Sequence, residues 1–190
     1  SLSTYGSLAV GIPGTIDGIF ASHKKFGSID IDTLFNYAIK LARNGFPITK
    51  TQAQGFNYYQ NDFLKFNPNN KYLQGSKWKA GDTLRQVDLA HTLSIIRDQG
   101  RDGFYTGEIA ESIIETTKEN GIISLRDLKN YKSIWRDPIK FNFGEYTIIT
   151  MPPPSSGGIA LAQLLMTLSN FDTNKLKHNK KTTAVFTGDG

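Results

Sequence analysis

The segment from Ile159 to Leu168 constrains the fold more than any other part of the sequence, because it is apolar on almost every face of the helix that it predicts. The preceding segment, Met151–Gly158, contains three consecutive prolines followed by Ser-Ser-Gly-Gly, and these residues set the start of the helix. A helix that is hydrophobic all round is normally buried. We therefore expect this helix to be buried, under a covering layer that sequence beyond these 190 residues would supply.

The residues before this segment predict a β-hairpin. Apolar residues alternate with polar ones along residues 139–143, and residues 146–150 are rich in β-branched side chains. Gly144 and Glu145 supply the turn between them.

Most of the remaining sequence has the periodicity of amphipathic helices. Apolar residues at intervals of three and four, with Gly and Pro-Asn stop signals, predict helices over residues 16–26, 31–44, 49–66, 84–97, 109–117 and 124–131. Thr15 is expected to cap the first helix, and Ser124 with Asp127 to cap the last. A short strand is expected at residues 9–14 and a turn at residues 79–82. The fold class expected is therefore α+β and helix-rich.

Composition indicates a folded chain with a basic surface. The apolar fraction is 38%, and 12 Phe, eight Tyr and two Trp supply bulk that disordered segments rarely carry. The 22 Lys and Arg residues against 17 Asp and Glu give a net charge of +5, which is compatible with nucleic-acid binding. Because the basic residues are spread along the chain and interleaved with acidic ones, a solvated surface explains them better than a nucleic-acid site.

Several classes of site and segment are excluded. The chain has no cysteine, which rules out disulfides, thiolate zinc sites and cysteine nucleophiles within it. No apolar run approaches the ~20 residues of a membrane-spanning helix, so we expect no span. Residues 2–10 are neither basic nor apolar enough for a signal peptide, and we expect any export signal to lie upstream of Ser1.

The residues able to carry chemistry do not name a reaction by their spacing. None of the three histidines has a second histidine or a carboxylate at the spacing of a helical metal pair; they are His23, His91 and His178. The segment Gly11–Gly18 is glycine-rich before a helix, but it lacks the P-loop and dinucleotide-loop patterns. Tight turning and close helix packing explain these glycines better. The carboxylates form no distinctive pair; they include Asp17, Asp82, Glu108 and Glu111.

Ser155 and Ser156 form the sharpest local feature. A serine at this place can cap the following helix, whose free N–H groups could bind an anion or stabilise an oxyanion. A serine nucleophile would also need a base and an orienting group. Neither serine can be paired with a His and an Asp by spacing, so a structural helix entry is the better interpretation.

Six motifs follow one another along the chain and cover roughly Leu8 to His178. They are Gly11–Gly18, Ala42–Phe46, Lys79–Gln86, Asp102–Ala110, Ile123–Tyr131 and Met151–Gly158. Read in order, they resemble the motifs of the γ-glutamyltransferase (γ-glutamyltranspeptidase) family. Each motif alone is weak evidence, but six in the same order are specific.

The resemblance implies an N-terminal nucleophile hydrolase fold, a four-layered αββα sandwich, in a precursor that cleaves itself into a large and a small subunit. In that family the new N-terminal Thr of the small subunit is the nucleophile, and its α-amino group can serve as the base. The γ-glutamyl group of glutathione or a related compound passes to this Thr and then to water, an amino acid or a peptide. The resemblance also implies a periplasmic or secreted enzyme that requires no cofactor.

On that resemblance, residues 1–179 correspond to the later part of the large subunit, and residues 180–190 are a tail that departs from the family. No catalytic, cofactor-binding or metal-binding residue is carried onto this chain, because the family's substrate-binding Arg lies upstream and its nucleophile downstream. Thr182 and Thr183 resemble the Thr-Thr of the processing site, but the residues after them fit poorly. We expect the chain alone to be inactive, with the remaining large-subunit segment and the small subunit as its partners.

Two other hypotheses stay open. A noncatalytic member that acts as an interaction or structural module would also leave a γ-glutamyl anilide intact, but would melt cooperatively as a well-packed monomer. A basic nucleic-acid binder would show strongly salt-dependent affinity for DNA or RNA.

Overall fold

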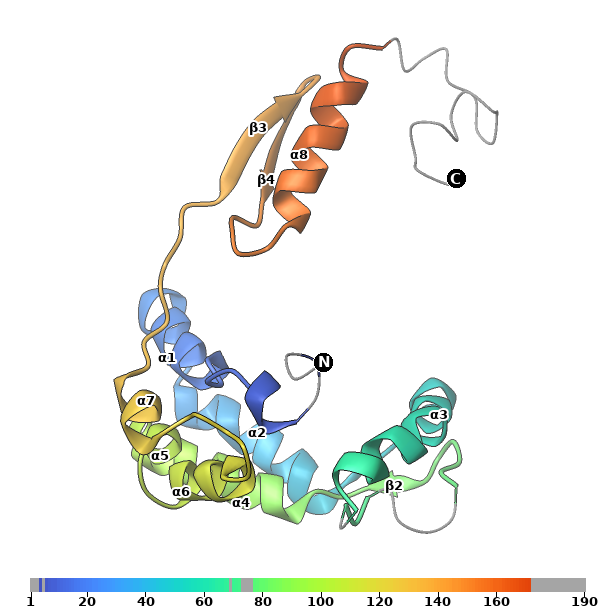
Figure 1. Cartoon of the computed structure of the whole chain (residues 1–190), viewed down its shortest axis with the longest axis vertical. Helices are drawn as coiled ribbons and strands as arrows, with labels where there is room; N and C mark the ends of the chain where they lie inside the picture. The colour runs from blue at the N-terminus through green and yellow to red at the C-terminus, as the bar shows by residue number, and fades with distance from the viewer. Residues whose placement is uncertain (1–3, 5, 69, 73–76, 172–190) are drawn as a thin grey trace. The chain divides into compact units, whose positions relative to one another are not determined.

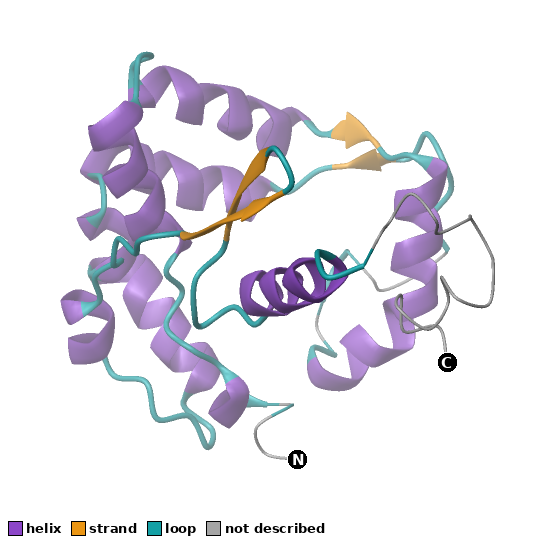
Figure 2. Cartoon of the chain, turned by 90° about the horizontal axis from the view of Figure 1, so that it is seen from above, coloured by secondary structure: helices purple, strands orange, loops and turns teal. Residues whose placement is uncertain are grey.

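The computed structural model describes residue 4 and residues 6–68, 70–72 and 77–171. These residues fall into two compact units, Ser1–Ser133 and Ile134–Gly190. Helices predominate over short strands (Figures 1 and 2), which is the helix-rich α+β class expected from the sequence.

The first unit is built from helices and one short pair of strands. Its helical elements are η1 (Ser7–Ala9), α1 (Thr15–Phe26), α2 (Ile31–Asn44), α3 (Lys50–Phe66), α4 (Val87–Gln99), α5 (Asp102–Tyr105), α6 (Gly107–Thr117) and α7 (Leu125–Asn130). Strands β1 (Phe46–Pro47) and β2 (Thr83–Leu84) pair antiparallel, with Phe46 opposite Leu84.

Local capping chemistry explains where several helices begin. Asp30 accepts a hydrogen bond from the backbone N–H of Thr33 at 3.1 Å and starts α2. Two reciprocal capping boxes start α3 and α7, where the cap residues Thr49 and Ser124 exchange hydrogen bonds with the third residue of each helix. The predicted helices over residues 31–44 and 49–66 and the predicted cap at Ser124 are confirmed.

Other boundaries differ from the prediction. Residues 9–14 do not form a strand: η1 ends at Ala9, and the residues before α1 are neither helix nor strand. Thr15 is the first residue of α1 rather than its cap, and Gly14 takes the cap position. Helix α4 begins at Val87 and not at residue 84, because Leu84 pairs in β2. Apolar periodicity alone cannot separate a buried strand residue from the helix that follows it.

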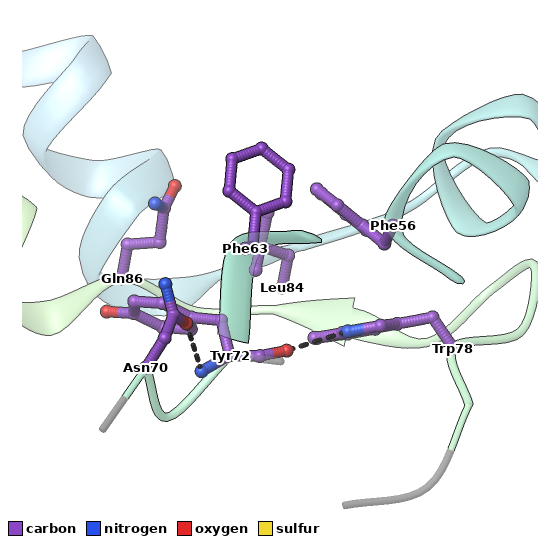
Figure 3. A pocket seen from close by; sticks show the side chains of 7 residues that line it. All are labelled: Phe56, Phe63, Asn70, Tyr72, Trp78, Leu84 and Gln86. Carbon is purple, nitrogen blue, oxygen red and sulfur yellow. Dashed lines mark hydrogen bonds between the residues drawn. The ribbon is translucent and has the colours of Figure 1, made fainter. Parts of the chain in front are cut away.

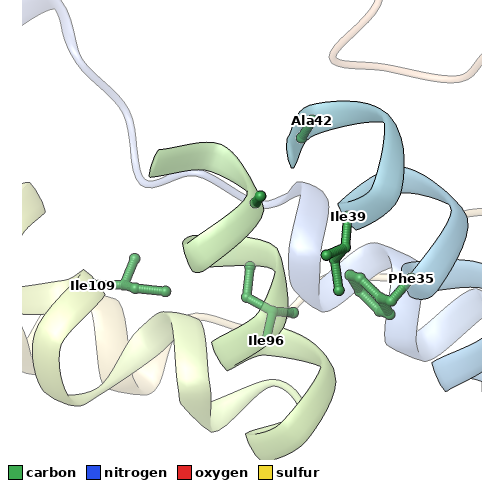
Figure 4. Close-up of a cluster of buried hydrophobic side chains, with 6 residues drawn as sticks. Phe35, Ile39, Ala42, Ile96 and Ile109 are labelled. Atoms are coloured by element: carbon green, nitrogen blue, oxygen red, sulfur yellow. The ribbon is translucent and has the colours of Figure 1, made fainter. Parts of the chain in front are cut away.

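The core of the first unit lies mainly between α2 and α4. Figure 4 shows the side chains of α2 facing those of α4, with Ile109 of α6 beside them. This cluster consists of Phe35, Ile39, Ala42, Ala90, Ile96 and Ile109. A second cluster joins α5, α6 and α7 through Tyr105, Ala110 and Leu128, each fully buried. Burial of apolar area is the main source of stability here.

The second unit contains a hairpin and one helix. Strands β3 (Ile139–Phe143) and β4 (Tyr146–Thr150) pair antiparallel, with Phe141 opposite Ile148, so the predicted hairpin is confirmed. Helix α8 (Gly157–Leu168) packs against β3. Gly158 allows this close approach, because a Cβ at this position would lie 1.9 Å from the carbonyl oxygen of Met151.

Helix α8 lacks cover on much of its surface in the described chain, and its burial under sequence beyond these residues stays a prediction. Ile159, Leu164 and Met166 are 43%, 54% and 57% exposed, and Gly158 is the buried residue of the helix. The physical reason is that only one side of α8 meets the hairpin. None of the helices within the described residues is long and apolar enough to cross a membrane.

Candidate functional site

A buried polar cluster in the first unit joins three segments that are far apart in sequence. Asp17, in the first turn of α1, is only 9% exposed. Its Oδ1 accepts a hydrogen bond from Arg101 Nε at 2.5 Å, and this contact is also an ion pair. Its Oδ2 accepts from the backbone N–H of Ser133 at 2.6 Å and from the Ser133 hydroxyl at 2.5 Å. Both carboxylate oxygens are therefore engaged within the chain.

The side chain of Tyr105 contacts both Asp17 and Arg101. Its hydroxyl donates to the carbonyl oxygen of Pro13 at 2.6 Å and accepts from the backbone N–H of Asp17 at 3.3 Å. The guanidinium of Arg101 lies 4.5 Å from the centre of the Tyr105 ring. The Tyr131 ring stacks on the Tyr105 ring at 5.7 Å between centroids.

The electrostatics of the cluster favour a fixed ion pair over proton transfer. Burial by itself would raise the pKa of Asp17, but the two hydrogen bonds from Ser133 and the hydrogen bond and charge of Arg101 outweigh it, so the pKa lies below its usual value of 3.8. Burial raises the pKa of the Tyr105 hydroxyl. Near neutral pH the carboxylate is therefore ionised and the phenol neutral, which suits a structural network rather than a general acid or base.

The sequence had presented Asp17 only as one of several carboxylates. Its partners lie 84 and 116 residues away along the chain, so no local spacing indicates them. The glycine-rich segment Gly11–Gly18 packs against the same cluster. A Cβ on Gly14 would lie 2.1 Å from the Tyr131 hydroxyl, so the close packing predicted for this segment is confirmed at that residue.

The other candidates lie outside this cluster, and two of them, His91 and Glu108, meet on the surface. His23 Nε2 lies 2.7 Å from the carbonyl oxygen of Ile29, and His91 Nε2 lies 3.1 Å from Glu108 Oε1 on the exposed surface. Asp82 accepts a hydrogen bond from the backbone N–H of Lys79 at 2.7 Å. Within the part of the chain that the structure describes, no group of three or more His, Cys, Asp or Glu side chains could hold a metal ion. His178, Thr182 and Thr183 lie outside the described residues.

The two serines before α8 start the helix. Ser155 Oγ accepts a hydrogen bond from the backbone N–H of Gly157 at 3.3 Å, while Ser156 occupies the cap position without a side-chain capping bond. Within the described residues, neither serine makes a hydrogen bond to a histidine or a carboxylate. The geometry is that of a helix entry.

An aromatic pocket of about 200 Å³ lies beside α3 and β2. Figure 3 shows the side chains that line it: Phe56, Phe63, Asn70, Tyr72, Trp78, Leu84 and Gln86. Trp78 is fixed by its indole N–H, which donates to the carbonyl oxygen of Tyr72 at 2.8 Å, and by two hydrogen bonds between its backbone and the side chain of Asn57. The described residues that line the pocket are mainly apolar and include no Ser, Cys, His, Asp, Glu or Lys.

The geometry does not identify the family of this chain, and a comparison with protein-family models does. The model described as gamma-glutamyltranspeptidase matches residues 1–187. The chain belongs to the γ-glutamyltranspeptidase family. This confirms the family inferred from the six motifs. The match runs past residue 179, and the boundary expected there stays a prediction, since it falls outside the described residues.

Relatives and solved structures of the γ-glutamyltranspeptidase family agree with this assignment. The glutathione hydrolase proenzyme of Escherichia coli (strain K12) is 40% identical over 172 residues, which is 88% of this chain and 30% of the relative. That of Bacillus subtilis (strain 168) is 38% identical over 169 residues, again 88% of this chain and 29% of the relative. The chain thus spans less than a third of the length of these relatives.

The fold is shared with solved members of the family. The γ-glutamyltranspeptidase of Helicobacter pylori superposes with a TM-score of 0.91 at 38% identity, over 99% of this chain and 55% of that chain. The transpeptidase enzyme CapD of Bacillus anthracis superposes with a TM-score of 0.80 at 32% identity, over 95% of this chain and 62% of that chain. These structures have the N-terminal nucleophile hydrolase fold, so the fold class predicted from the resemblance is confirmed.

Proposed function

We propose that this chain forms the later part of the large subunit of an enzyme that transfers the γ-glutamyl group of glutathione, or of a related γ-glutamyl compound, to water, amino acids or peptides. The observation that carries the proposal is the superposition on the Helicobacter pylori enzyme, which takes in 99% of this chain but only 55% of the other. Because nearly the whole chain superposes on one part of that enzyme, the best-supported function of the chain is the one that this part has there.

The chain contributes scaffold rather than chemistry in this proposal. The polar cluster of the first unit has no free nucleophile, since both oxygens of Asp17 are occupied by Arg101 and Ser133. The nucleophile would be the N-terminal Thr of a small subunit produced by self-cleavage of the precursor. The partners are then the rest of the large subunit and that small subunit, in a periplasmic or secreted enzyme.

A segment exchange tests the proposal. The matching 172 residues of the Escherichia coli proenzyme are replaced by this chain, and release of p-nitroaniline from γ-glutamyl-p-nitroanilide is measured. We expect the exchanged precursor to cleave itself into two subunits and to turn over the anilide, and the 190-residue chain alone to release nothing. Turnover by the chain alone, abolished by Thr183→Ala, would contradict the proposal.

A noncatalytic role as an interaction or structural module is the second candidate. The observation that favours it is the well-formed core of the first unit, which includes fully buried Ile96, Tyr105 and Leu128. An exchanged precursor that folds and cleaves itself but does not turn over the anilide would favour this role, particularly if the chain alone melts cooperatively as a monomer.

A further inference from the structure

Residues 129–133 form the last segment of the first unit, and charged groups hold its backbone on two sides. Ser133 donates its backbone N–H and its hydroxyl to Asp17 Oδ2, at 2.6 Å and 2.5 Å. Arg101 Nη2 donates to the carbonyl oxygen of Lys129 at 3.3 Å and to that of Tyr131. Four hydrogen bonds thus join this segment to one carboxylate and one guanidinium.

The two charged groups also hold each other in place. The ion pair between Arg101 Nε and Asp17 Oδ1 measures 2.5 Å, with side chains 25% and 12% exposed. Tyr105 contacts both members of the pair: its ring lies against the Arg101 guanidinium, and its hydroxyl accepts a hydrogen bond from the Asp17 backbone N–H. The ion pair thus binds the backbone of residues 129–133 from both of its members.

Apolar burial holds this segment only in part. Leu128, which precedes it, is fully buried, and the Tyr131 ring stacks on Tyr105. Lys132 is exposed, and Ile134 and Trp135 just beyond are 73% and 55% exposed. From residue 131 to residue 138 the chain is neither helix nor strand. The hydrogen bonds to Asp17 and Arg101 are thus the main interactions that hold residues 129–133 to the rest of the first unit.

We infer that Asp17 and Arg101 form a latch that fastens residues 129–133 to the first unit, and that this segment opens on its own when the latch is broken. The latch ends at Ser133, the last residue before the second unit, so it determines where the connection to that unit begins. Asp17→Asn leaves one neutral amide oxygen in place of two carboxylate oxygens, so the positions of Oδ1 and Oδ2 can no longer both accept hydrogen bonds, and Arg101 loses its buried charged partner. The α2–α4 core shares no side chain with the latch, so we expect this core to remain folded when the latch is broken.

Hydrogen exchange of the 190-residue chain tests the latch. In Asp17→Asn we expect amide exchange in peptides that cover residues 129–136 to become at least about tenfold faster, while peptides from α2 and α4 change by less than about twofold, as for a local opening. The matched control is Asp88→Asn, which removes an exposed carboxylate, 70% exposed and paired with Lys71. It should leave residues 129–136 unchanged.

A second variant keeps the test decisive if Asp17→Asn lowers the stability of the whole unit. Ser133→Ala retains the ion pair and the backbone N–H bond and removes only the hydroxyl bond. We expect faster exchange confined to the same segment, by about threefold, and faster tryptic cleavage after Lys132. Unchanged exchange at residues 129–136 in both variants, or equal acceleration throughout the first unit in both, would overturn the latch.

Discussion

The two units of this chain differ in whether they have a buried apolar core. All of the buried hydrophobic core residues of the described chain lie in the first unit, from Phe35 to Leu128. Both units expose large apolar side chains, such as Phe26, Tyr58 and Ile122 in the first. In the described part of the second unit, residues 134–171, the exposed ones have no buried apolar core beneath them: Ile134, Trp135, Tyr146, Ile149, Met151, Ile159, Leu161, Leu164, Met166 and Phe171.

This difference predicts that the first unit is the more stable of the two. A two-stranded hairpin with one helix buries too little apolar surface to offset the entropy of ordering its residues. The helices of the first unit bury two clusters of apolar side chains between them. Large exposed apolar surface is typical of a contact face, and in the proposed enzyme the rest of the protein would cover the second unit.

The largest expected effect comes from emptying the core of the first unit. Leu128→Ala removes a fully buried side chain packed with Tyr105 and Ala110 and should lower the free energy of unfolding by about 3 kcal/mol. The matched change in the second unit, Leu164→Ala, removes a side chain that is 54% exposed and should change it by less than about 0.5 kcal/mol. Urea unfolding followed by circular dichroism measures both.

Equal losses in the two variants would break the comparison. They would mean that Leu164 is buried in solution, for instance between two copies of the chain. Repeating the unfolding of Leu164→Ala over a range of protein concentrations would separate that case from a packed monomer, because the stability of an associating chain depends on concentration.

Two glycines at the start of α1 give a smaller effect. Gly14→Ala, at the cap position, would place a methyl group 2.1 Å from the Tyr131 hydroxyl, and the stack on Tyr105 limits how far that ring can retreat. We expect a loss of about 2 kcal/mol. Gly18→Ala, inside α1, meets nothing within 4 Å and should stabilise the chain by about 0.5 kcal/mol, since alanine favours a helix. The same sign for both variants would argue against close packing at Gly14.

Local patterns predicted the elements better than the contacts between them. The hairpin at residues 139–150, the helix over 31–44 and the capping box at Ser124 depend on residues close in sequence, and they are confirmed. The strand pair that includes Leu84 depends on Phe46 and Pro47, which lie far away along the chain. No periodicity of four or fewer residues indicates such pairings.

The candidate site shows the same limit more sharply. Asp17, Arg101 and Ser133 come from three separate segments, and each looks like an ordinary surface residue in its own stretch of sequence. The one usable local signal is the close packing of glycines before α1, which predicted a tight approach without naming Tyr131 as its partner. The composition of α8 indicates that the helix needs a covering layer, but it does not indicate which residues supply that layer, and much of the helix is exposed in the described chain.

The smallest expected effect is a dependence of the first unit's stability on acid. Folding lowers the pKa of Asp17 below its ordinary value of 3.8, so the folded chain binds this proton more weakly than the unfolded chain does. The contribution of Asp17 is therefore complete above the unfolded pKa and is lost as pH falls through the lower folded pKa. We expect the difference in the free energy of unfolding between wild type and Asp17→Asn to be constant above about pH 5 and to narrow in more acidic solution.

Urea unfolding of both proteins at each pH measures this difference directly. Because Asp98 and Asp127, whose pKa values are also lowered, are present in both proteins, their effects cancel in the difference. A difference that stays constant, or widens in acid, would mean that Asp17 is not the ionised partner of Arg101 that the structure shows. The first unit would then lack the electrostatic contribution that distinguishes it here from the second.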